Sequence, residues 1–153
     1  MVTNTYMAPA ECATLLPFAQ VLRGTNGANT INGSTGRDLI IGYGGNDTID
    51  AKSGDDCVLA GDGDDNVQGG SGSDVIFGGN GTDTLDAGSD LDLVIVIGGD
   101  GADNIDGGSD NDRLFGDEDT NATDTDGDTD TIAGGGNTDI CVGDVETSCE
   151  ANP

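Results

Sequence analysis

A single apolar side chain recurs every nine residues along most of this chain. In a frame that starts at Gly24, it stands at the eighth position of each nine-residue unit, two places after an acidic residue. Most of these side chains are β-branched, which is typical of the inward row of a β-strand. We therefore predict an all-β protein whose inward row is Ile31, Ile40, Ile49, Val58, Val67, Ile76, Leu85, Val94, Ile105, Leu114, Thr123, Ile132 and Cys141.

The nine-residue frame divides the chain into three parts. Thirteen units fill residues 24–142, with one slip of two residues that we assign to Val96 and Ile97. Residues 1–23 form an amino-terminal arm, whose end keeps the phase of the units and is a candidate first strand. Residues 143–153 form a carboxy-terminal cap.

The residues on either side of the inward row alternate in character from one unit to the next. One set is polar, as in Thr30 with Asn32 and Thr48 with Asp50. The other set is apolar and, apart from Cys57 and Arg113, comprises Leu39, Ile41, Leu59, Val75, Phe77, Leu93, Ile95 and Phe115. Because side chains next to an inward residue point outward, one broad face is predicted to be polar and the other apolar. A continuous apolar face marks either an interface or a covered surface, so the arm, a partner or a second copy are all candidate covers.

The sixth position of the unit carries the candidate ligand residues. Aspartate fills eleven of the thirteen positions, with asparagine at Asn29 and Asn121; the aspartates are Asp38, Asp47, Asp56, Asp65, Asp74, Asp83, Asp92, Asp103, Asp112, Asp130 and Asp139. The chain has 28 glycines, 30 acidic residues and a formal net charge of −26. Such a charge opposes compaction and disfavours binding to nucleic acid or anionic membranes, which are bound through Lys and Arg. Cations are the expected partners.

The phrase "GGSGSDVIFGGNGTDTLD" at residues 69–86 resembles the nonapeptide repeat of RTX proteins. The resemblance covers residues 24–142 and implies a right-handed parallel β-roll, in which six residues of each unit form a turn and three form a strand. It also implies Ca²⁺ between stacked turns, held by backbone carbonyls and by sixth-position aspartates two units apart. Calcium prefers six to eight such hard oxygens. At most about eleven ions would nearly cancel the charge, although residues 116–129 depart from the pattern and are doubtful sites.

Four cysteines indicate an oxidising, extracellular or cell-surface location. They allow three pairings, of which we favour Cys12 with Cys57, tying the arm to the apolar face, and Cys141 with Cys149, closing the last coil. Free buried thiols are the alternative. No segment approaches the length of a transmembrane helix.

We expect no enzymatic activity, because the chain has no histidine and each aspartate is accounted for by the repeat. The favoured function is a secreted structural or assembly protein, a matrix, surface or filament subunit that calcium makes rigid. It would self-associate through the apolar face, the arm or the ends of the solenoid. The alternatives are an adhesive or ice-binding module and an accessory region of a secreted hydrolase or toxin.

Overall fold

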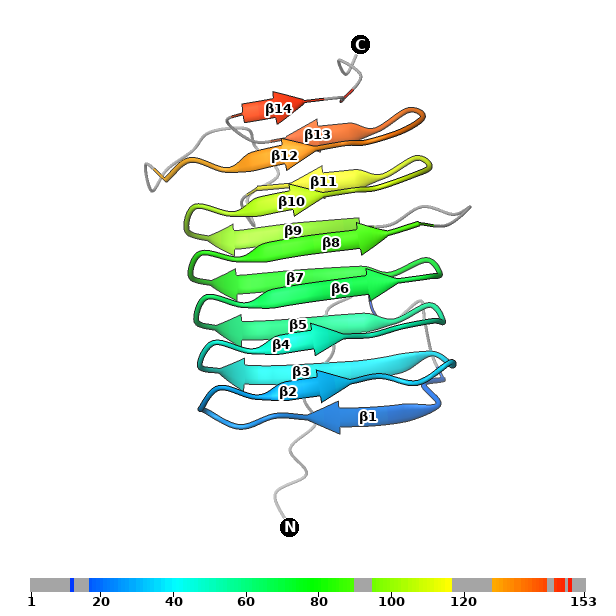
Figure 1. Cartoon of the computed structure of the whole chain (residues 1–153), viewed down its shortest axis with the longest axis vertical. Coiled ribbons are helices and arrows are strands. Elements are labelled where there is room, and N and C mark those ends of the chain that lie inside the picture. Colours follow the sequence, from blue (N-terminus) through cyan, green and yellow to red (C-terminus); the bar gives the residue numbers. More distant parts are fainter. Residues whose placement is uncertain are drawn as a thin grey trace.

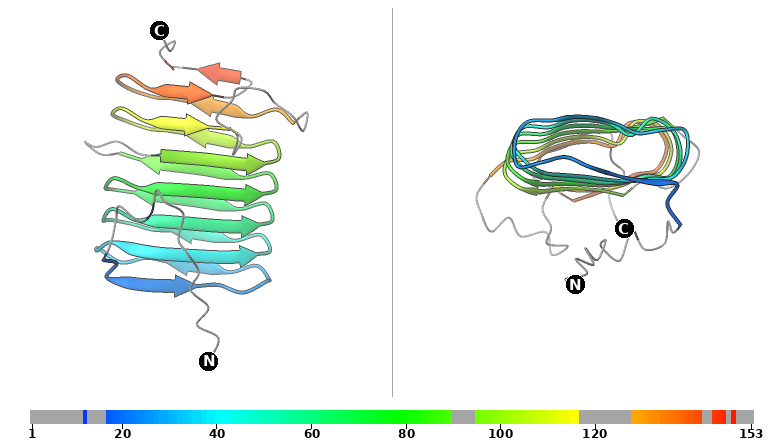
Figure 2. Two further views of the ribbon diagram at one scale, coloured as in Figure 1. Left: turned by 180° about the vertical axis from the view of Figure 1, so that it is seen from behind. Right: turned by 90° about the horizontal axis from the view of Figure 1, so that it is seen from below.

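The chain folds into a flattened stack of short parallel strands (Figure 1). We describe Cys12 and residues 17–89, 95–116, 128–142, 145–147 and 149 of a computed structural model. Successive strands alternate between two seven-stranded sheets that face each other, so the view from below shows the coils superimposed as one narrow loop (Figure 2). The described residues contain no helix that is long and apolar enough to span a membrane. The prediction of an all-β, parallel solenoid is confirmed.

The odd-numbered strands form one sheet, here called the odd sheet, in the order of the sequence. Its members are β1 (Gln20–Arg23), β3 (Asp38–Gly44), β5 (Cys57–Asp62), β7 (Val75–Asn80), β9 (Ile95–Asp100), β11 (Arg113–Phe115) and β13 (Ile140–Val142). The even-numbered strands form the facing even sheet. Its members are β2 (Thr30–Asn32), β4 (Thr48–Asp50), β6 (Asn66–Gly70), β8 (Thr84–Gly88), β10 (Asn104–Asp106), β12 (Thr131–Ala133) and β14 (Val145–Thr147).

The inward row predicted from the sequence forms the core between the two sheets. Ile40, Val58 and Ile76 from the odd sheet are fully buried, and Ile49 and Val67 face them from the even sheet at no more than 1% exposure. Each coil adds only two such side chains, so the core is a single column that lengthens with every coil. Burying one of these side chains stabilises the fold by about 1.5–3 kcal/mol.

Glycine lets successive turns pack backbone against backbone. Gly70 has a φ of +99°, and a Cβ placed there would run into the backbone oxygen of Lys52 in the neighbouring coil. Lys52 occupies the equivalent position one coil earlier and adopts a φ of +78° with a side chain in place. The recurring glycines are therefore required by the close stacking of the turns as well as by the left-handed conformation.

The two-residue insertion lies earlier than the sequence indicated. The register pairs Val75 with Ile95 and Ile76 with Val96, while Ser89 pairs with Ser109. The extra residues are therefore between Ser89 and Ile95, outside the strand, and the predicted slip at Val96 and Ile97 is wrong. Val96 is the buried residue of this coil; Asp92, Leu93 and Val94 lie outside the described residues.

One predicted unit adds no strand to the stack. β10 pairs directly with β12, matching Ile105 to Ile132, and β11 pairs directly with β13. The offset between these partners is 27 residues instead of the usual 18, so the unit at residues 116–124 has no place in the register of either sheet. The expected inward residue Thr123 lies outside the described residues. A hydroxyl in the apolar column would be costly to bury, whereas Ile132 fills the column with no exposed surface.

The roll extends slightly beyond the predicted repeat region at both ends. β1 comes from the end of the predicted arm and pairs with β3, placing Leu22 against the core. β14, within the predicted cap, pairs with β12. Two disulfides, Cys12–Cys57 and Cys141–Cys149, join the pairs favoured from the sequence.

Much of the apolar face is covered within the chain itself. Leu39, Ile41, Leu59 and Val75 are at most 8% exposed and form a second cluster with the disulfide-bonded Cys12, while Phe18 packs against it. The sequence left open whether these four residues lie at an intermolecular interface or under the arm, and their burial in one chain favours the arm as the cover. Phe77, Ile95 and Phe115 are half-buried, and their contribution to an interface remains a prediction. Leu93 lies outside the described residues.

Candidate metal centre

The sixth-position aspartates stack into two ladders, one along each edge of the roll. We call the aspartates preceding odd strands the first ladder: Asp38, Asp56, Asp74, Asp112 and Asp139. Those preceding even strands form the second ladder: Asp47, Asp65, Asp83, Asp103 and Asp130. All ten are at most 4% exposed. The remaining predicted ligand, Asp92, lies outside the described residues.

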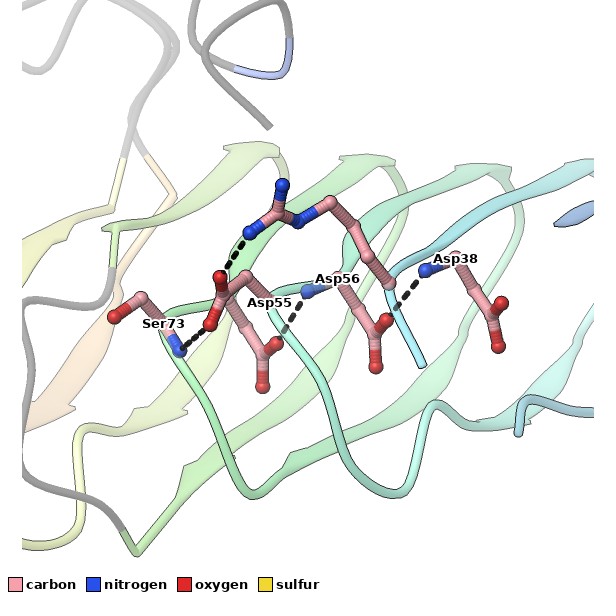
Figure 3. A network of polar contacts seen from close by, with 6 residues as sticks. Asp38, Asp55, Asp56 and Ser73 are labelled. Carbon is pink, nitrogen blue, oxygen red and sulfur yellow. Dashed lines mark hydrogen bonds and ion pairs between the residues drawn. The ribbon is translucent and has the colours of Figure 1, made fainter. Parts of the chain in front are cut away.

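Each ladder is built by one repeated hydrogen bond. The backbone N–H of Asp38 donates to Oδ1 of Asp56 at 2.6 Å, and that of Asp56 donates to Oδ1 of Asp74 at 2.8 Å (Figure 3). On the other edge, Asp47 and Asp65 make the same bond over 2.7 Å. The bond also spans the long coil, joining the N–H of Asp103 to Asp130 at 2.9 Å. One carboxylate oxygen of the aspartate therefore bridges two coils.

The second carboxylate oxygen is buried without a hydrogen bond at several coils. Oδ2 of Asp47, Asp56, Asp65 and Asp83 has no partner among the described residues. In the second ladder this oxygen lies close to the first glycine of its own turn: a Cβ at Gly78 would run into Oδ2 of Asp83. A buried carboxylate with a free oxygen is costly unless a cation or donor compensates it.

Burial changes the proton affinity of these carboxyls. Loss of solvation and, to a smaller extent, the negative charge of the neighbouring ladder aspartate raise the pKa of Asp56, Asp65 and Asp83 to about 6. The hydrogen bond from the neighbouring backbone opposes the shift by stabilising the carboxylate. Without a cation, the folded chain therefore holds these groups in an unfavourable charged state at neutral pH.

The two ladders differ where the insertion occurs. Between Asp74 and Asp112 the first ladder has no described aspartate, because the residues that precede Ile95 lie outside the described residues. The second ladder has an aspartate at each coil from β4 to β12.

A second row of carboxylates lies in the turns, one residue before the ladders. Asp55 forms an ion pair with Arg37 and accepts a hydrogen bond from the backbone of Ser73 at 3.2 Å (Figure 3). The bond from Arg37 holds the pKa of Asp55 below its usual range. Asp64 likewise accepts from the backbone of Thr82 at 3.1 Å. These pairs are 18 residues apart, and that spacing at the fifth position was the signal available in the sequence.

The donor set suits a hard cation bound largely by backbone. Among the described residues, no three His, Cys, Asp or Glu side chains come together as a cluster, so side chains alone make no complete cage. Ca²⁺ accepts carboxylate and carbonyl oxygens together. The free Oδ2 atoms and the carbonyls of the glycine turns are the oxygens that such an ion requires, and it would compensate the buried charge.

Comparison with known protein families identifies the repeat. The family model of the RTX calcium-binding nonapeptide repeat (4 copies) matches residues 23–56, 59–94 and 95–122, which is more than half of the chain. Searches of curated proteins and of solved structures found no match. Together with the parallel roll and its aspartate ladders, the family match shows that the chain belongs to the RTX calcium-binding nonapeptide-repeat family.

Proposed function

We propose that this protein is a secreted structural subunit whose β-roll is made rigid by calcium and serves in a matrix, surface layer or filament. RTX nonapeptide repeats bind calcium. The observation that carries the proposal is the placement of the ligand aspartates: they form two buried ladders that bridge successive coils along most of the roll. Metal at these positions would act on the stiffness of the whole stack rather than on a single reaction centre.

Calcium would be held by the ladder aspartates and by turn carbonyls, and it would supply positive charge where the chain buries negative charge. The Oδ1 atoms already link neighbouring coils through backbone N–H groups, which fixes the carboxylates in position. Asp47, Asp65 and Asp83 would then offer their free Oδ2 atoms to the ion. Binding would thereby favour the stacked state over the unfolded chain, in which no such sites exist.

Several features support secretion and a non-enzymatic role. RTX repeat proteins are typically secreted, and two disulfides fit an oxidising compartment. Calcium is also plentiful enough outside cells to fill weak sites. The chain has no histidine, and the buried aspartates are engaged in the stacking of the coils.

Sedimentation velocity in millimolar calcium and in excess chelator tests this proposal. We expect large, polydisperse species in calcium and a slow monomer in chelator. A chain that remains monomeric in calcium at high protein concentration would contradict the assembly role.

The exposed face of the even sheet favours one alternative, an adhesive or ice-binding module. Thr30, Thr48 and Thr84 lie in one exposed row, because their strands pair in register and each threonine points outward. Acidic residues such as Asp86 interrupt the neighbouring row, which matches ice poorly. A thermal hysteresis assay in calcium separates the two functions, since a structural subunit is expected to show none.

A further inference from the structure

Exposed apolar side chains gather at the two ends of the stack. Among the described residues, the large hydrophobic side chains that are clearly exposed are Val21 at 41%, Tyr43 at 39%, Ile140 at 38% and Val145 at 45%. Val21 is on β1, the first strand of the odd sheet, and Ile140 is on β13, its last strand. Val145 is on β14, the last strand of the even sheet. Tyr43 is on β3, which pairs with β1, so it lies one coil inside the amino-terminal end.

The exposed residues at opposite ends occupy the same row of the roll. Strand pairing in the odd sheet connects one outward residue per strand: Val21, Leu39, Cys57, Val75, Ile95, Arg113 and Ile140. In the even sheet the corresponding row begins at Thr30 and ends at Val145. If β1 of a second copy paired with β13, Val21 would therefore lie beside Ile140, and β2 would meet β14, without a change of register.

The terminal strands offer the hydrogen-bonding groups for such a junction. Among the strands that the structure describes, β1 pairs with β3 alone and β13 with β11 alone, and the even sheet likewise ends at β2 and β14. An edge strand of a parallel sheet presents backbone N–H and C=O groups that can pair with another strand. Figure 1 shows β1 and β14 at opposite ends of the stack, so one molecule carries two different and complementary ends.

The two ends of the chain also differ strongly in charge. The first 54 residues contain four acidic and three basic residues, a formal charge of −1, whereas the last 54 contain sixteen acidic residues and only Arg113, a formal charge of −15. Arg23 on β1 is exposed at the less charged end. Contact between unlike ends therefore brings together less like charge than contact between two carboxy-terminal ends would.

Neutral amides take the place of carboxylates at the start of both ladders. Gln20 pairs in register with Asp38 and donates to its Oδ2 at 3.1 Å. Asn29 occupies the first position of the second ladder, where its backbone N–H donates to Asp47 at 2.7 Å. At a head-to-tail junction, Asp139, which precedes β13, would thus face the amide of Gln20 instead of a further carboxylate.

We propose that copies of this chain stack head to tail, with β1 and β2 of one copy pairing with β13 and β14 of the next. The proposal rests on the assembly role given above and names its interface. Because the two surfaces in contact are different, each added copy leaves one free end of each kind. Repetition therefore produces an open filament rather than a dimer. The filament is a continuation of the roll, with both sheets running through the junctions.

Two end-blocked variants of the full chain test this arrangement by sedimentation velocity in calcium. Val21→Glu places a charge on the amino-terminal end and Ile140→Glu on the carboxy-terminal end. Tyr43→Glu changes an equally exposed residue that is on no terminal strand and is the matched control. We expect either end variant alone to remain monomeric and the Tyr43 variant to assemble as the parent does. An equimolar mixture of the two end variants retains one intact pair of ends and is expected to form dimers and nothing larger.

The outcomes separate the interface from the function. If the parent polymerises in calcium and both end variants do so equally well, the head-to-tail interface is refuted while the assembly role stands. If the parent stays monomeric, the assembly role fails and the interface with it. Calcium-induced circular dichroism verifies the fold of each variant. Should Val21→Glu fail to fold, the exposed Arg23→Glu variant replaces it, and polymers equal to those of the parent would then count against the proposal.

Discussion

The sign of the pH dependence of stability is expected to reverse when calcium is removed. In calcium-free protein, Asp56, Asp65 and Asp83 are buried, and desolvation raises the pKa of each from 3.8 to about 6. Between these values the folded state binds more protons than the unfolded state. The free energy of unfolding must therefore rise as the pH falls from 7 to 5. In calcium the ion and the proton compete for the same carboxylates, so acidification is expected to reduce stability instead.

The magnitude follows from the size of the shift. A carboxyl with a pKa of about 6 in the fold and 3.8 in the unfolded chain holds, on average, about half a proton more in the folded state between pH 5 and pH 7. Over two pH units this contributes about 1.4 kcal/mol, since one unit is worth about 1.4 kcal/mol. The three carboxyls together contribute about 4 kcal/mol. That is a large fraction of the stability of an ordinary domain.

Urea unfolding followed by circular dichroism at pH 5, 6 and 7 measures this effect in excess EDTA and in calcium. Asp65→Asn is the matched variant, because the amide keeps an oxygen for the N–H of Asp47 and removes the titrating proton. Its increase in stability on acidification is expected to be about one third smaller than that of the parent. A free energy of unfolding in EDTA that is constant or falls from pH 7 to pH 5 would refute the reasoning.

Three further predictions concern the turns and the first disulfide. Gly70→Ala is expected to destabilise the calcium-loaded roll by more than about 2 kcal/mol, because the methyl group meets the backbone of the neighbouring coil. Gly27→Ala places its methyl group with no atom within 4 Å, so its free energy of unfolding is expected to stay within about 0.5 kcal/mol of the parent's. Equal losses for the two variants in urea unfolding would contradict this. Lys52→Gly is expected to raise the free energy of unfolding by about 1 kcal/mol, since Lys52 has a φ of +78°, and a loss would show that its side chain outweighs the backbone strain. Replacing both Cys12 and Cys57 by Ser opens a link across 45 residues, and we expect a loss of about 4 kcal/mol with increased binding of a hydrophobic dye; unchanged dye binding would mean that the apolar face stays covered.

The sequence alone predicted the features that repeat with every coil. A side chain at the eighth position has the same environment each time, so Ile40, Val58 and Ile76 could be assigned to the core by counting. The buried sixth-position aspartates follow from the same regularity. Periodicity is informative here because the physical environment of each position is itself periodic.

The position of the insertion could not be predicted because its length, two residues, equals the period with which side chains alternate along a strand. Apolar residues fill residues 93–97, so shifting the frame by two residues leaves the alternation of inward and outward side chains unchanged. Val94 and Val96 are therefore equivalent candidates for the core in the sequence. Only the pairing of Val96 with Ile76 distinguishes them.

The extra unit before β12 was misjudged for a related reason. Residues 116–124 keep the nine-residue phase, but a complete coil requires two units. Adding one unit as a strand would have moved Ile132 and all later residues to the opposite sheet. The observed pairing of Ile132 with Ile105 keeps each later strand in its own sheet, an outcome that depends on tertiary pairing and that phase alone does not encode.

The 27-residue coil shows how weakly distant parts of the roll constrain each other. β10 and β12 pair in register although their connection is half a coil longer than the others. The pairing of a coil therefore depends on its contacts with the adjacent coil and not on the length of the chain between them. Stability in such an array approximates a sum of nearest-neighbour terms, as in a one-dimensional Ising chain. Whole coils can then be gained or lost during evolution, and a segment can be inserted at an edge of the roll. In each case the energetic effect is confined to the coils on either side.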